Sequence, residues 1–247
     1  MTEQAIRTRV LEGGVALLTL SRPGKRNAIS IEMRREISAC LASWGDDAAI
    51  GAVVLTGDGA AFSAGFDLDE FKQPERFDEL FETSTRYHRD VWAFPKPVVA
   101  AVNGPAMGGG FDLATLCDLR VASTRATFGH PEIKFGAPPL YTPLRYIVGE
   151  GVARDLCLTG RRMGAEEAQR VGLVSEVIDS HQLEDRAVAV ARQILEAPAH
   201  ALRFTKGYFL ANAGKGFEES FLVEHDRAFR EVILPDMAAR ARHAGEP

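Results

Sequence analysis

The chain contains little cysteine and no long uninterrupted apolar run. Its 247 residues include only three cysteines, at wide spacings that form no Cys-x-x-Cys pair and no His/Cys cluster: Cys40, Cys117 and Cys157. This pattern predicts reduced thiols and no metal centre. Lys96 and several glycines interrupt the longest apolar stretches, and the N-terminal residues lack the apolar core of a signal peptide. We therefore expect a cytoplasmic protein without a membrane partner.

An excess of positive charge is also absent. Lysine and arginine total 29 against 34 aspartates and glutamates, which gives a net charge of -5. Proteins that coat nucleic acids usually present a basic surface, so we expect no nucleic-acid partner. The dinucleotide pattern G-x-G-x-x-G and the phosphate-binding pattern G-x-x-x-x-G-K-[ST] are both missing. A nucleotide-dependent oxidoreductase or a P-loop enzyme is therefore disfavoured.

What is present is the composition of a globular protein, with 46% apolar and 26% charged residues. The apolar pattern predicts a hairpin over residues 5–20, helices over 31–44 (capped by Ser30) and 76–92, and buried strands at 52–56 and 97–102. Strands and helices alternate to about residue 130, and from about 142 the pattern is mainly helical apart from a short strand within 174–178. We therefore expect an α/β core over residues 1–195 and a helical region over 196–247, because Pro198 interrupts a helical pattern.

Two glycine-rich loops each lead from a strand toward a helix. They contain the sequences AMGGGFD, from Ala106 to Asp112, and FSAGFDL, from Phe62 to Leu68. Glycine lets a ligand approach the main chain, and the first amides of a helix have no internal partner, so two such loops can stabilise one oxyanion. A tight packing turn is the alternative. Ser63 is a poor candidate for a nucleophile because it is not framed as G-x-S-x-G.

The charged residues near these loops include a pair of acids, Asp112 and Glu132. Two carboxylates at the ends of adjacent elements can act together as base and acid. Alternatively, Asp112 caps a helix and Glu132 is solvated. His130 is either a further base or a hydrogen-bonded surface group. Lys25 and Arg26 either meet phosphates or belong to a solvated loop.

Five segments, in this order, resemble the crotonase family, the enoyl-CoA hydratase/isomerase group. They are SRPGKRNAIS, GAAFSAGFDL, AAVNGPAMGGGFDLATLCDLRVAS, ATFGHPEIKFG and LTGRRMGAEEAQRVGLVSEV. The resemblance covers about residues 5 to 180. It implies the crotonase (ClpP/crotonase-like) α/β fold of repeated ββα units in two roughly perpendicular sheets, with a C-terminal helical trimerisation region. It also implies an acyl-CoA thioester as substrate, a homotrimer or dimer of trimers, and no cofactor beyond the coenzyme A of the substrate.

The resemblance further assigns roles to residues of this sequence. Glu132 and Asp112 take the two catalytic acid positions, and the amides of Phe66 and Gly109 form the oxyanion hole. The implied substrate-binding positions are Arg26, Ala28, Ala64, Asp67, Leu68, Gly108 and Leu140. The activity implied is that of a hydratase-type lyase, which adds water reversibly across the 2,3 double bond of an enoyl-CoA.

Three departures from the family pattern bear on this activity. Asp112 replaces the glutamate of hydratases, as in dienoyl-CoA isomerases, but their third acid is replaced here by Leu140. The stretch GAPPLYTPL replaces a glycine-rich segment and should reshape the acyl pocket, and the tail DRAFREVILPDMAARARHAGEP lacks the usual ending. The alternatives are a delta-isomerase in which Glu132 shuttles the proton, another crotonase reaction such as decarboxylation or thioester hydrolysis, and a non-catalytic acyl-CoA binder or RNA-binding relative.

Overall fold

The computed structural model describes residues 4–211, 214 and 231. The chain divides into two compact units, Met1–Ile194 and Leu195–Pro247. The roles expected for the two parts, catalysis and oligomerisation, stay predictions. Within the second unit the structure describes helix α7 (Ala199–Ala211), and the tail that begins at Asp226 lies outside the described residues apart from Glu231.

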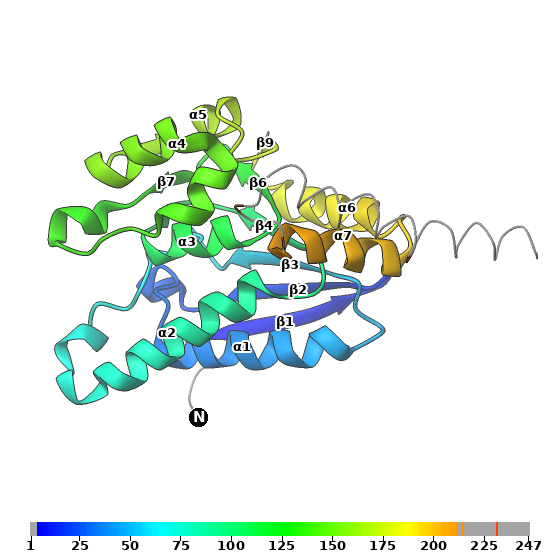
Figure 1. Cartoon of the computed structure of the whole chain (residues 1–247), viewed down its shortest axis with the longest axis horizontal. Coiled ribbons are helices and arrows are strands. Elements are labelled where there is room, and N and C mark those ends of the chain that lie inside the picture. Colours follow the sequence, from blue (N-terminus) through cyan, green and yellow to red (C-terminus); the bar gives the residue numbers. More distant parts are fainter. Residues whose placement is uncertain (1–3, 212–213, 215–230, 232–247) are drawn as a thin grey trace, which may run out of the picture. The chain divides into compact units, whose positions relative to one another are not determined.

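A six-stranded sheet forms the centre of the first unit (Figure 1). Its strands, in spatial order, are β1 (Ile6–Leu11), β2 (Val15–Leu20), β3 (Ala52–Gly57), β4 (Val98–Val102), β6 (Leu119–Ser123) and β9 (Glu176–Ile178). The first two strands are antiparallel and the others pair in parallel. Gly13 and Gly14 close the predicted hairpin with positive φ angles, which glycine adopts without strain.

A second, three-stranded sheet contains β5 (Ala106–Met107), β7 (Thr127–Gly129) and β8 (Arg162–Gly164). Strands β4 and β5 lead into helix α3 (Gly109–Leu116), and β6 and β7 lead into α4 (Tyr141–Thr159). Each of these ββα units contributes its first strand to the large sheet and its second to the small one. The resemblance implied such repeated units, whereas the apolar pattern missed the three short strands because two or three residues show no periodicity.

The remaining elements cover the sheets. Helices α1 (Ile31–Asp46) and α2 (Phe77–Trp92) pack against each other, and α6 (Leu183–Ile194) packs on β3, β4 and β6. Ser30 caps α1 as predicted, because its side chain accepts a hydrogen bond from the amide of Met33. The shorter elements are η1 (Pro23–Lys25), η2 (Glu70–Lys72), η3 (Pro74–Arg76), η4 (Pro131–Phe135) and α5 (Ala165–Arg170).

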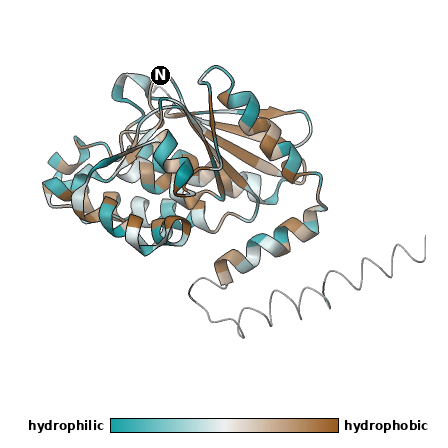
Figure 2. Ribbon diagram, turned by 90° about the horizontal axis from the view of Figure 1, so that it is seen from above, coloured by the Kyte–Doolittle hydropathy of each residue, from teal (hydrophilic) through white to brown (hydrophobic). Residues whose placement is uncertain are grey.

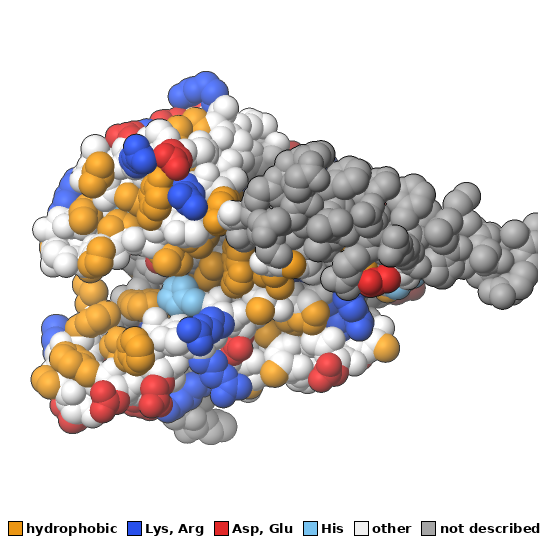
Figure 3. Space-filling view, in the orientation of Figure 1, with side chains coloured by type: hydrophobic (Ala, Val, Ile, Leu, Met, Phe, Trp, Pro, Cys, Tyr) orange, Lys and Arg blue, Asp and Glu red, His pale blue; other side chains and the backbone are white. Residues whose placement is uncertain are grey.

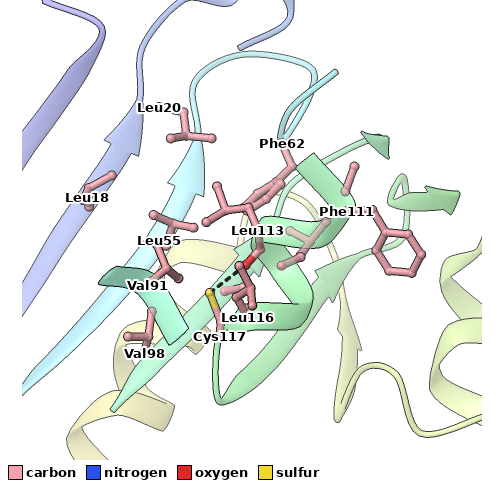
Figure 4. Packing of buried hydrophobic residues seen from close by; sticks show 14 of the residues in the cluster. Leu18, Leu20, Leu55, Phe62, Val91, Val98, Phe111, Leu113, Leu116 and Cys117 are labelled. Carbon is pink, nitrogen blue, oxygen red and sulfur yellow. Dashed lines mark hydrogen bonds between the residues drawn. The ribbon is translucent and has the colours of Figure 1, made fainter. Parts of the chain in front are cut away.

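The hydrophobic core lies on both faces of the central strands. Every residue of β3 and β4 is buried, and Figure 2 shows the central strands as hydrophobic while the helices alternate in hydropathy. On one face, Leu55 and Val98 pack with Val91 of α2 and Leu113 of α3 (Figure 4). All three cysteines are free thiols, as expected. Among residues 4–211, no helix combines the length and apolarity needed to cross a bilayer.

Candidate active site

A cavity of about 510 Å³ opens between α2, the start of α3 and the segment from η4 to α4. In the space-filling view, hydrophobic side chains lie on both sides of this hollow (Figure 3). Its apolar lining includes Phe66, Phe71, Phe135 and Leu140. Such a lining suits an apolar acyl group, and a few polar groups then fix its orientation.

The two glycine-rich loops meet at the cavity wall. Gly65 has a φ of 93°, and a β carbon there would lie 2.8 Å from the Met107 carbonyl oxygen and 3.2 Å from the Gly109 amide nitrogen. Only glycine allows this approach. Within the described chain, the amides of Phe66 and Gly109 donate to no protein acceptor, and Gly109 is the first residue of α3. The loops therefore present two free amide donors to one region, as an oxyanion hole requires.

Ser63 holds these loops together and is not placed as a nucleophile. Its side chain is fully buried, and its hydroxyl donates to the Asn27 carbonyl at 2.8 Å and accepts from the Gly65 amide at 3.2 Å. Its carbonyl accepts a hydrogen bond from the Met107 amide at 2.9 Å. The serine links three segments of the chain, so its role is structural.

Asp112 lies in the first turn of α3 with its carboxyl group buried. Its amide donates to the carbonyl of Gly108, which occupies the N-cap position, so Asp112 does not cap the helix. Burial raises the pKa of the Asp112 carboxyl to about 7; His130 lowers this pKa and Glu132 raises it further. The Oδ1 atom accepts no hydrogen bond from any described residue. A carboxyl with such a pKa exists in both forms near neutral pH, which suits a proton donor and acceptor.

Glu132, in η4, and His130, the residue directly before η4, both lie close to Asp112. The Nδ1 atom of His130 lies 2.9 Å from Glu132 Oε1 and 3.9 Å from Asp112 Oδ1. The imidazole is completely buried and packs on the ring of Phe111, with centroids 4.8 Å apart. The interpretation of His130 as a surface group is therefore wrong.

The structure brings most of the predicted site residues to the cavity. Those that line it are Ala64, Phe66, Leu68, Gly108, Gly109, Asp112, Glu132 and Leu140. Arg26, Ala28 and Asp67 lie outside its lining, in the adjoining loops. Arg26 accepts a hydrogen bond from the Ala64 amide at 2.9 Å through its carbonyl, and Asp67 forms an ion pair with Arg22 at 2.8 Å. The roles of all these residues toward coenzyme A stay predictions.

Sequence reasoning missed His88 of α2, which also lines the cavity. Its Nδ1 atom lies 2.7 Å from the Ser84 carbonyl oxygen, and burial lowers the pKa of the imidazole. Phe71 was missed as well, although η2 begins two residues after the FSAGFDL loop. Pro138 and Pro139 do line the cavity, in the stretch where the sequence predicted a reshaped pocket.

Two converging amide donors and a pair of acids at an apolar cavity define an enzyme that stabilises an oxyanion and transfers protons. A family model described as enoyl-CoA hydratase/isomerase matches residues 11–233. A probable enoyl-CoA hydratase of Rhizobium meliloti is 41% identical over 246 residues, covering 94% of this chain and 96% of the relative. A putative enoyl-CoA hydratase of Thermus thermophilus is 39% identical over 221 residues, covering 86% and 87%.

The solved structures agree with this assignment. The crystal structure of enoyl-CoA hydratase from Bacillus anthracis has a TM-score of 0.89 at 31% identity, covering 93% of this chain and 91% of that one. The chain belongs to the enoyl-CoA hydratase/isomerase family and has the crotonase fold that its sequence predicted.

Proposed function

We propose that this enzyme adds water reversibly across the 2,3 double bond of a 2-enoyl-CoA. The observation that carries the proposal is the placement of the free amides of Phe66 and Gly109 beside the acids Asp112 and Glu132 in one apolar cavity. Several relatives named enoyl-CoA hydratases, at 35% to 41% identity, support the same activity.

In the proposed reaction, the thioester carbonyl oxygen accepts hydrogen bonds from the amides of Phe66 and Gly109. Negative charge develops on this oxygen as the enolate forms, and loss of one such donor costs about 3 kcal/mol of barrier. Glu132 removes a proton from water while the water oxygen bonds to C3 of the acyl group. Glu132 then passes this proton to C2, while Asp112 holds the water and shares in the transfer, so one water molecule is consumed and both acids return to their starting forms.

The surrounding residues supply binding rather than chemistry. The apolar lining receives the acyl chain, while Arg26, Ala28 and Asp67 flank the coenzyme A portion. This addition requires no metal and no redox cofactor, since coenzyme A arrives as part of the substrate. We further propose that the enzyme acts as a homotrimer or a dimer of trimers in the cytoplasm.

Glu132→Gln tests the proposal, because the amide keeps the size of the carboxylate and cannot act as a base. With short- and medium-chain 2-enoyl-CoA substrates, kcat should fall by about 100- to 10,000-fold, the usual range for loss of a general base. Glu166→Gln, which changes an exposed acid of α5 outside the cavity, is the matched control and should retain full activity. Hydration that is unaffected by Glu132→Gln would overturn the assignment. Faster conversion of 3-enoyl-CoA by the unmodified enzyme would favour the isomerase instead.

A further inference from the structure

We propose that His130 is a positioning residue of this active site, which orients the Glu132 carboxylate and adjusts the charge shared by Glu132 and Asp112. The proposal rests on the hydration reaction above and assigns His130 a role within it. Its imidazole faces both acids through one nitrogen atom.

The imidazole ring of His130 is held in one place by the residues around it. His130 has no exposed surface, and its ring packs against Phe111, whose ring in turn lies 5.5 Å from that of Phe128 between centroids. A buried ring held between a strand end and a helix has little freedom to rotate. The Nδ1 atom is therefore held beside Glu132 Oε1, at 2.9 Å.

The contact with His130 determines which carboxylate oxygen of Glu132 is left to react. Oε1 is engaged by His130, whereas Oε2 is buried and has no hydrogen-bond partner among the described residues. Oε2 also faces Gly108, where a β carbon would come within 3.1 Å of it. The contact of His130 with Oε1 thus directs Oε2 of Glu132 toward the loop that contains Gly108 and Gly109. Orientation of a catalytic base by a third group is a general device for placing it accurately.

Asp112 and Glu132 share one site, and two acids so placed resist simultaneous ionisation. After burial, the strongest influences on the pKa of Asp112 are His130, which lowers it, and Glu132, which raises it. Two further titratable groups that interact with these acids are neutral, because burial raises the pKa of the Cys157 thiol on α4 to about 11 and that of the Tyr87 hydroxyl on α2 well above its usual value.

Arg161, beside β7, forms ion pairs with Asp155 and Glu167 and is already neutralised there. His130 is thus the group that lies against both acids, with its Nδ1 atom 2.9 Å from Glu132 Oε1 and 3.9 Å from Asp112 Oδ1. Loss of the imidazole should raise the pKa of Asp112 further and shift the pH at which the enzyme gains or loses activity.

Two substitutions distinguish a positioning role of His130 from a role in which its ring only fills space in the core. In His130→Asn, the side-chain amide nitrogen takes nearly the place of Nδ1 and can donate to Glu132, but it cannot carry charge. In His130→Leu, the apolar volume is kept while both the donor and the charge are lost. The measurements are kcat and KM for a 2-enoyl-CoA, the pH profile of kcat, and thermal unfolding of each variant.

We expect His130→Leu to lower kcat by about 100-fold, the usual consequence of a misplaced catalytic group, with KM changed less than about threefold. His130→Asn should restore kcat to within about tenfold of the unmodified enzyme, and the limb of its pH profile that reports Asp112 should move to higher pH. Equal kcat values for the two variants, or a pH profile that does not move in His130→Asn, would overturn the proposal. If His130→Leu does not fold, the pH profile of His130→Asn alone decides.

Failure of the proposed hydration can be distinguished from failure of the proposed role of His130. An unmodified enzyme that hydrates no 2-enoyl-CoA disproves the proposed function and leaves the positioning of Glu132 to be tested by structure. Crystal structures of the two variants serve this purpose without turnover. A Glu132 carboxylate that turns away in His130→Leu and stays in place in His130→Asn supports the role of His130, and an unchanged carboxylate in both contradicts it.

Discussion

The Oε2 atom of Glu132 lies against Gly108, so closely that a β carbon on Gly108 would come within 3.1 Å of it. Gly108 has a φ of 50° and a ψ of -126°. This backbone conformation is strongly unfavourable for residues other than glycine. It directly precedes Gly109, whose amide is proposed to bind the thioester oxygen. One residue without a side chain therefore couples the position of the proposed catalytic acid to that of the proposed oxyanion hole.

Gly108→Ala should disturb both features at once. The added methyl group pushes on the Glu132 carboxylate and strains the backbone, so we expect kcat for 2-enoyl-CoA hydration to fall by about 10- to 100-fold. The free energy of unfolding should fall by about 1 to 3 kcal/mol. Steady-state kinetics and urea unfolding measure the two effects.

Gly164→Ala is the matched control for this change. Gly164 has a φ of -80°, and a β carbon there would meet no atom of the described residues within 4 Å. Its unfolding free energy should stay within about 0.5 kcal/mol of the unmodified enzyme, with kcat unchanged. If both alanine variants behave alike, the contact between Gly108 and Glu132 has no catalytic importance.

Ser63→Ala tests the structural role of the buried hydroxyl. The Asn27 carbonyl and the Gly65 amide lose their hydrogen-bond partner, so the free energy of unfolding should fall by about 1 to 3 kcal/mol. The backbone bond between Met107 and Ser63 remains, and kcat should therefore stay within about tenfold. Loss of a nucleophile would instead abolish nearly all activity.

The exposed Ser43 on α1 offers the control for that substitution. Ser43→Ala should change neither the unfolding free energy nor kcat. A Ser63→Ala enzyme that is as stable as the Ser43→Ala enzyme would show that the hydroxyl does not hold the loops together.

Most of the large sheet and its helices could be predicted from sequence because their residues are buried in a regular pattern. The run AVVLT predicts strand β3. The capping residue Ser30 predicts the first residue of α1 correctly. The second sheet could not be found this way. Strand β5 has two residues and β7 has three, and such strands form only because longer elements bring them together.

Some residues of the candidate site could likewise be predicted from the sequence, and others could not. Glycine-rich loops carry a local conformational requirement, so the loops that contain Gly65 and Gly108, both with positive φ angles, could be identified from sequence alone. His130 could not be placed, because its burial depends on packing against Phe111, nineteen positions earlier in the chain. The contribution of α2 to the cavity, through His88, is likewise a consequence of tertiary packing and not of any local pattern.

Leu140→Ala tests whether the reshaped segment before α4 binds the acyl group. Leu140 lines the cavity, and its truncation removes apolar surface that a bound acyl chain would cover. We expect KM for a medium-chain 2-enoyl-CoA to rise by about three- to tenfold, with little change in stability. Leu158→Ala, at an exposed leucine of α4 outside the cavity lining, should leave KM unaltered. Equal KM values for the two variants would place the acyl chain elsewhere.

Asp112→Asn should alter how stability depends on pH. Burial raises the pKa of Asp112 from 3.8 to about 7, so the folded protein holds this proton more tightly than the unfolded chain. The resulting stabilisation is complete below pH 3.8 and is lost as the pH rises through about 7. Asparagine carries no titrating proton, and the variant should therefore gain stability relative to the unmodified enzyme across this range.

The gain should reach up to about 4 kcal/mol at pH 8, which corresponds to a pKa difference of about three between the folded and unfolded states. Urea unfolding of both proteins at pH 5 and pH 8, at one protein concentration, measures it. The same substitution should lower the rate of hydration, because it removes a group that is proposed to share in the proton transfer. A stability difference that stays constant with pH, or that shrinks as the pH rises, would mean that the Asp112 carboxyl is ionised in the folded enzyme throughout and that its burial does not set its protonation.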